Sequence, residues 1–81
     1  MKVRAIRGAT QLESDSLEEM RKAVVDLLTT LFAENEISTD DLISILFTAT
    51  PDIHSDFPAA AARTLDLGAI PLICAQEIDV A

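Results

Sequence analysis

Two side chains of opposite charge stand near the ends of two apolar stretches and are candidates for a ligand site. Arg7 belongs to residues 2–10, whose loose alternation predicts a strand with Arg7 on a mostly small, apolar face. Glu77 lies near the end of residues 70–80, an apolar run that predicts the last strand. A charge in such a place needs a partner, because burying an unpaired charge is costly. An interior ion pair and a shared polar ligand both meet that need, and the residues alone leave both open.

The remaining reactive side chains give weaker signals. His54 is the only histidine and Cys74 the only cysteine. Neither has companions at the spacing of a zinc site, so no metal is predicted. We expect His54 to be an ordinary loop residue and Cys74 a buried structural one, since the thiol has no histidine at a recognisable spacing. No glycine-rich phosphate loop occurs, and no cofactor is predicted.

An amphipathic helix should follow the first strand. Six apolar residues recur at steps of mostly three and four, which forms one stripe: Leu17, Met20, Val24, Leu27, Leu28 and Leu31. Asp15 is the predicted N-cap, and Glu18 stands three residues on, at capping-box spacing. The helix should end near Glu34 or Asn35, with Asn35 in the left-handed conformation.

The middle of the chain predicts a strand. Residues 38–41 (STDD) indicate a turn or a short helical start. Residues 42–50 are a nearly continuous apolar run, typical of a central strand covered on both faces, and Pro51 ends it. Earlier in the chain, Gly8 indicates a bend or a close approach of the backbone to another element.

A short helix and a final strand complete the predicted fold. Pro58 suits the first position of a helix, and residues 59–62 are alanines, which favour helix. Gly68 is the predicted break before the last strand. The order strand, helix, strand, short helix, strand predicts one α/β domain over residues 1–81, with a mixed sheet and a right-handed crossover.

Composition excludes several classes of partner. Fourteen acidic against six basic residues give a net charge of −8, which argues against nucleic acid and anionic membranes. A small anion stays compatible, because a distant acidic surface is screened over about 8 Å at physiological salt. A single cysteine fits a reducing compartment. With no signal peptide and no membrane-spanning run, we expect a soluble, cytoplasmic protein.

Three separated blocks carry a family resemblance: residues 3–10 (VRAIRGAT), 48–59 (TATPDIHSDFPA) and 74–80 (CAQEIDV). In order and spacing they resemble the monofunctional chorismate mutases of the AroH type. The resemblance implies a homotrimer arranged as a pseudo-α/β barrel, with active sites at subunit interfaces. It also implies conversion of chorismate to prephenate, an isomerisation on the route to phenylalanine and tyrosine.

The resemblance also implies site residues. Arg7 matches an arginine that binds the substrate, whereas Cys74 and Glu77 match residues that meet the substrate hydroxyl. The pocket wall and rim are matched by five further positions, namely Phe57, Ala59, Arg63, Leu72 and Ile73.

The resemblance covers the N-terminal two-thirds of the family sequence. A further arginine, a tyrosine and at least one strand of the family lie beyond the matched part. The 81 residues alone are therefore expected to have little mutase activity. The alternative hypothesis is a truncated, non-catalytic relative that oligomerises or binds a small anion.

Overall fold

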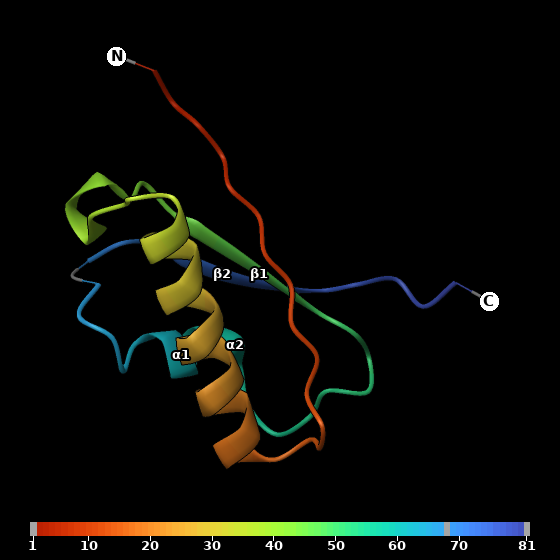
Figure 1. The fold of residues 1–81 in the computed structure, drawn as a ribbon. Coiled ribbons are helices and arrows are strands. Elements are labelled where there is room, and N and C mark those ends of the chain that lie inside the picture. Colours follow the sequence, from red (N-terminus) through yellow and green to blue (C-terminus); the bar gives the residue numbers. More distant parts are fainter. Residues whose placement is uncertain (1, 68, 81) are drawn as a thin grey trace.

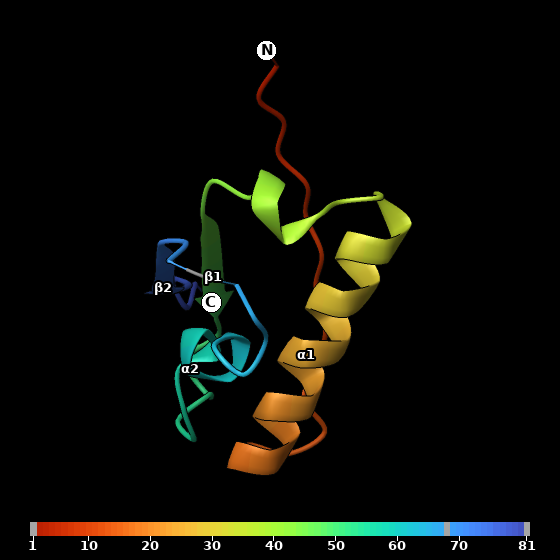
Figure 2. The same ribbon diagram turned by 90° about the vertical axis from the view of Figure 1, so that its left-hand side faces the viewer.

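One long and one short helix lie against a small parallel sheet. The fold is that of a computed structural model, which describes residues 2–67 and 69–80. The elements follow as α1 (Leu17–Glu34), the 3₁₀ helix η1 (Thr39–Asp41), β1 (Ile45–Ala49), α2 (Pro58–Ala62) and β2 (Leu72–Gln76) (Figure 1). Viewed from the side, α1 forms a layer beside the strands, and α2 packs on α1 and also reaches both strands (Figure 2). The α/β class and the two predicted helices are confirmed, whereas the described residues form a parallel sheet in place of the predicted mixed one.

The first turn of α1 is capped one residue later than the sequence predicts. Ser16 is the N-cap, and its hydroxyl accepts a hydrogen bond from the Glu19 N–H at 3.1 Å. The prediction of Asp15 as the cap is therefore wrong, because the Asp15 carboxylate is bonded to a distant loop instead. Neither α1 nor any other helix in the described part of the chain is both long and apolar enough to cross a membrane.

The end of α1 agrees with the sequence in position but not in conformation. The helix ends at Glu34, and the cap residue Asn35 has a φ of −109°. Its side-chain amide donates to the Leu31 carbonyl at 2.8 Å, so Asn35 caps the helix with its side chain. The positive φ of 52° belongs to Glu36 instead. The short helical start predicted for residues 38–41 is confirmed as η1.

The sheet consists of β1 and β2, paired in parallel from Ile45 opposite Leu72 to Ala49 opposite Gln76. The prediction that β1 is covered on both faces is wrong within residues 2–67 and 69–80. Burial alternates along β1, and Leu46 is 65% exposed. Its register partner Ile73 is 56% exposed on the same face. The helices of this chain cover one face of the sheet and leave the other open.

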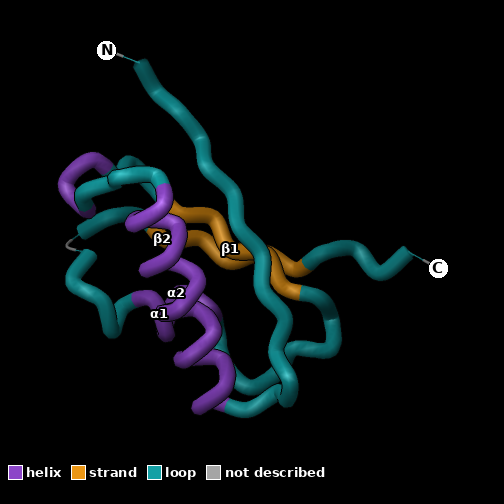
Figure 3. The backbone as a smooth tube through the Cα atoms, in the orientation of Figure 1, coloured by secondary structure: helices purple, strands orange, loops and turns teal. Residues whose placement is uncertain are grey.

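The N-terminal segment, residues 2–10, is extended but unpaired. The sequence predicts a strand there, and the structure shows a loop that runs beside α1 (Figure 3). An extended segment becomes a strand only when another strand exchanges hydrogen bonds with it. The close approach predicted at Gly8 is confirmed, because a β-carbon there would lie 3.0 Å from methyl carbons of Leu27 and Leu31.

The core lies between the two helices and the covered face of the sheet. Pro58 starts α2 as predicted, and Ala61 and Ala62 are completely buried. They share one cluster with four larger buried residues, Met20, Val24, Leu28 and Leu67. The break predicted at Gly68 lies outside the described residues.

Replacing Ser16 by alanine tests which residue caps α1. We expect Ser16→Ala to lower the free energy of unfolding by about 1 kcal/mol, because the Glu19 N–H loses its acceptor. The midpoint of urea unfolding measures this loss. The matched control is Ser14→Ala, which removes a hydroxyl from the same exposed approach to the helix and should change the midpoint little. Equal effects of the two substitutions would contradict the cap assignment.

Candidate functional site

A pocket lies at the carboxyl ends of the two strands. Parallel strands place these ends at one edge of the sheet, which is where open α/β sheets place their ligands. The pocket has a volume of about 370 Å³. Its walls come from the end of β1, the following loop, the start of α2 and β2, namely Ala49, Thr50, Ile53, His54, Ser55, Asp56, Phe57, Pro58, Cys74, Ala75 and Gln76. Two of the predicted site residues, Phe57 and Cys74, therefore meet here.

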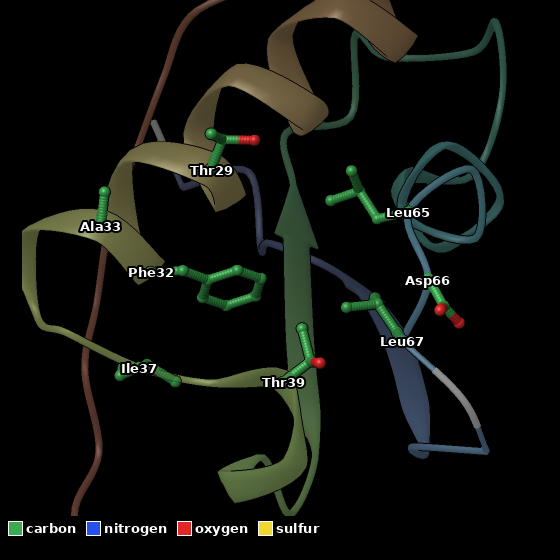
Figure 4. A pocket seen from close by; sticks show the side chains of 8 residues that line it. All are labelled: Thr29, Phe32, Ala33, Ile37, Thr39, Leu65, Asp66 and Leu67. Carbon is green, nitrogen blue, oxygen red and sulfur yellow. The ribbon is translucent and has the colours of Figure 1, made fainter.

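A second pocket of about 370 Å³ lies near the C-terminal part of α1. Figure 4 shows the Phe32 ring on one side and Leu65 and Leu67 on the other. Its one charged lining residue, Asp66, directs its carboxylate away from the ring (Figure 4). None of the predicted site residues lines it. We therefore take the pocket at the strand ends as the candidate site.

The loop between β1 and α2 is anchored from outside by Asp15. The backbone N–H of His54 donates to Asp15 Oδ2 at 2.8 Å, and that of Ser55 donates to Oδ1 at 2.9 Å. Next along the loop, Asp56 Oδ1 accepts the Phe57 N–H at 2.8 Å. Sequence reasoning missed this role of Asp15, because the partners are 39 and 40 positions away and leave no local signal.

These contacts favour the ionised form of Asp15 and lower the pKa of its carboxyl from the ordinary 3.8. The neighbouring Ser55 hydroxyl is the strongest influence, although Ser55 Oγ has no hydrogen bond of good geometry. The two backbone N–H groups and the His54 imidazole act in the same direction, and lost hydration opposes them. Asp15 therefore carries its charge at neutral pH and keeps both oxygens available as acceptors.

Glu77 lies just beyond β2 and extends the strand pairing by one bond. Its N–H donates to the Ala49 carbonyl at 2.9 Å. Its exposed carboxylate accepts a hydrogen bond from Thr48 Oγ1 at 3.4 Å. The side chain is thus held at the same end of the sheet as the pocket, although it does not line the pocket.

Arg7 is exposed on the N-terminal segment beside α1. Within residues 2–67 and 69–80, an ion pair joins Lys22 and Asp26 at 3.0 Å, whereas none joins Arg7 and Glu77. The interior ion pair between two strands is not formed, since both side chains face solvent and Arg7 is not on a strand.

The predicted wall and rim residues on α2 occupy different surroundings. Phe57, at the N-cap position of α2, is 70% exposed and lines the pocket. Ala59 is half-buried in the first turn of the helix and does not line the pocket. Arg63 caps the other end of α2, where its Nη2 donates to the Ile70 carbonyl at 3.0 Å. Its guanidinium thus supports the connection to β2.

The predicted wall residues on β2 alternate between the two faces of the sheet. Leu72 is half-buried and packs against the core, whereas Ile73 faces the open side. Successive strand residues point to opposite faces, and neither of these two lines the pocket at the strand ends. Cys74 is a free thiol that is half-buried, less than the sequence predicts, and it lines the pocket.

The arrangement offers shape and polar contacts to a small molecule. In the described part of the chain, no cluster of three or more histidine, cysteine, aspartate or glutamate residues is placed to hold a metal ion. The pocket combines an exposed aromatic ring, a thiol, an amide and a carboxylate from Phe57, Cys74, Gln76 and Asp56. Such a site can orient a small polar molecule.

Similarity to known proteins agrees with the three sequence blocks. The model of the family described as chorismate mutase type I matches residues 3–81. Chorismate mutase AroH of Bacillus subtilis is 42% identical over 81 residues, which are 99% of this chain and 64% of that protein. Chorismate mutase AroH of Thermus thermophilus is 40% identical over 79 residues, 96% of this chain and 65% of that protein.

A solved structure has the same fold. A chorismate mutase from Clostridium thermocellum superposes with a TM-score of 0.92 at 41% identity, over 96% of this chain and 70% of that one. The chain spans slightly less than two thirds of the length of the two curated relatives. With the match over residues 3–81 and about 40% identity to both curated relatives, the chain belongs to the chorismate mutase type I family.

Proposed function

We propose that the protein is a chorismate mutase, which rearranges chorismate to prephenate in the biosynthesis of aromatic amino acids. The observation that carries this proposal is the family match over residues 3–81, with two relatives named chorismate mutase AroH at about 40% identity. We place the protein in the cytoplasm, where a reducing environment suits the free thiol of Cys74.

The proposed chemistry uses neither a nucleophile nor a general base, although Cys74 and His54 both line the pocket. The rearrangement is pericyclic, so one C–O bond breaks while one C–C bond forms, and no proton has to be transferred to a side chain. The enzyme's task is to hold the dianion in its compact conformer and to stabilise the charge that separates along the breaking bond. In the proposed roles, Arg7 supplies positive field and Glu77 meets the substrate hydroxyl.

The positively charged side chains that would bind a dianion have to come from residues outside the pocket of a single chain. Within the described residues, those that line the pocket include no lysine or arginine, and they include the Asp56 carboxylate. Arg7 is exposed on the N-terminal segment and is not among the residues that line the pocket. This separation supports a site at a subunit interface, where the Arg7 of one copy completes the pocket of another.

The open face of the sheet supports the same assembly. Leu46 and Ile73 are register partners that expose their side chains on one face, and Ile43, just before β1, is 66% exposed. Large exposed apolar side chains that gather on one face mark interaction surfaces. We propose that this face packs against further copies in a homotrimer with the form of a pseudo-α/β barrel.

Loss of chorismate tests the proposed activity. The intact mass of the purified protein is determined on the sample that is assayed, because the 81 residues alone, of 8.7 kDa, are expected to turn over slowly. With protein of larger mass from the same reading frame, we expect prephenate to form. Arg7→Ala should then lower kcat/KM by roughly 100-fold, the usual effect of removing one electrostatic contact.

The matched control is Arg4→Ala, which removes an exposed guanidinium from the same segment and should leave kcat/KM nearly unchanged. If protein longer than 81 residues consumes no chorismate, the mutase proposal fails and the non-catalytic alternative replaces it. Equal losses in the two variants would contradict the specific role of Arg7.

Sedimentation velocity tests the proposed trimer. Leu46→Asp places a charge on the open face of the sheet, and we expect it to shift the protein from trimer toward monomer. Thr30→Asp adds the same charge at an exposed position of α1, away from the open face, and should leave the trimer intact. A wild-type protein that sediments as a stable monomer at micromolar concentration would contradict the assembly.

A further inference from the structure

The feature that carries a further inference is the double hydrogen bond between Asp15 and the loop after β1. Asp15 precedes α1, and its two carboxylate oxygens each accept one N–H, from His54 and from Ser55. Both bonds are short, at 2.8 and 2.9 Å. Two consecutive N–H groups on one carboxylate determine the orientation of that peptide as well as its position.

The anchored loop has few other attachments on the way to the pocket. A backbone bond from the Ile53 N–H to the Thr50 carbonyl, at 3.1 Å, forms a turn, and Ile53 packs against the core. Residues 54–57 are exposed or half-buried, and none of them belongs to the core cluster. Asp15 therefore holds a stretch of the loop that lies outside this cluster.

This stretch forms one wall of the candidate site. His54, Ser55, Asp56 and Phe57 all line the pocket. The Phe57 ring is largely exposed, so core packing does not determine where it lies. The position of the ring depends on the backbone that precedes it. That backbone is held by the Asp15 bonds and by the bond from the Phe57 N–H to Asp56.

We infer that Asp15 is a positioning residue, which holds residues 54–57 in the conformation that lets the Phe57 wall bind substrate. This inference rests on the proposed function, since it takes the pocket at the strand ends as the chorismate site. Asp15 does not line that pocket and acts through the backbone it holds. Asp15 should therefore contribute to substrate binding, because a pocket wall without a fixed position makes weaker contacts with the substrate before the reaction begins.

Two substitutions remove this anchor to different degrees. Asp15→Asn keeps one carbonyl acceptor and loses the charge, whereas Asp15→Ala removes both acceptors. The control is Asp26→Asn, which makes the same charge change on α1 and removes an exposed ion pair with Lys22. Asp26 is distant from the loop in the sequence, and its partner Lys22 lies on the same helix. All variants are made in the protein whose chorismate turnover is assayed.

Kinetics provide the first readout. We expect Asp15→Ala to raise KM for chorismate roughly tenfold, with kcat changed less, because a tenfold loss of binding corresponds to only about 1.4 kcal/mol of lost contact with the displaced wall. Asp15→Asn should lie between wild type and Asp15→Ala, and Asp26→Asn should match wild type. A role in folding alone would lower the amount of active enzyme and leave KM unchanged. An unchanged KM in both Asp15 variants overturns the inference.

Amide proton NMR provides the second readout and does not depend on turnover. Bonds to a carboxylate should move the His54 and Ser55 amide protons downfield, and Asp15→Asn should reverse this shift while Asp26→Asn does not. Unchanged resonances in Asp15→Asn overturn the anchor itself. If wild type neither binds nor converts chorismate, the proposed function fails, and these resonances still decide whether Asp15 holds the loop. If Asp15→Ala does not fold, Asp15→Asn decides the result on both readouts.

Discussion

The contact between α2 and α1 is the one on which the rest of the structure depends. Ala61 and Ala62 are completely buried against the apolar stripe of α1, which Met20, Val24 and Leu28 provide. Side chains this small let the two helices approach closely, and interiors packed at this density leave little freedom for either partner to shift. Since α2 starts directly after Phe57, the same contact determines where the pocket wall begins.

The site is made of parts that are each held by a different element. The strand ends supply Cys74 and Gln76, the N-terminus of α2 supplies the aromatic ring of Phe57, and Asp15 holds the loop between them. The proposed pericyclic rearrangement needs a fixed shape and fixed charges rather than a nucleophile beside a base. Its barrier falls when a flexible dianion is held in one shape and its separating charge is stabilised.

The negative net charge of the protein acts against the binding of an anion, so local positive charges have to compensate for it. The chain carries a net charge of −8, so its far field repels a dianion. Screening at physiological salt weakens that repulsion beyond about 8 Å, so the cations nearest to the anion determine whether it binds. A few arginines brought to one place can therefore bind an anion that the surface as a whole repels.

Local sequence signals predicted the elements well, and contacts between distant residues explain what they missed. The apolar spacing located α1, Pro58 located the start of α2, and the apolar runs located both strands. The helix cap was placed one residue early because Asp15 is occupied by a loop 39 positions away. Residues 2–10 have the pattern of a strand, but pairing depends on a neighbour that this pattern does not specify.

The residues predicted for the site are spread over the structure, and two of the eight line the candidate pocket. The three sequence blocks identified Phe57 and Cys74, and the structure brings them into one pocket. Leu72 and Ile73 are consecutive residues of a strand, so the sequence alone already implies that their side chains point to opposite faces of the sheet. Asp15 could not be found this way, because a carboxylate before a helix has the same local appearance whether it caps the helix or binds a distant loop.

Gly8 has a consequence for its neighbour Arg7. The segment that carries both has no strand pairing, so its distance from α1 is set by contact between atoms alone. A methyl group at position 8 would lie 3.0 Å from the side chains of Leu27 and Leu31, inside the roughly 3.5–4.0 Å of a favourable carbon contact. Either the leucine methyl groups would shift by a few tenths of an ångström or the backbone would lift and carry the guanidinium beside it outward. The missing atom of glycine thus lets the segment that carries this cation lie directly against the side chains of the helix.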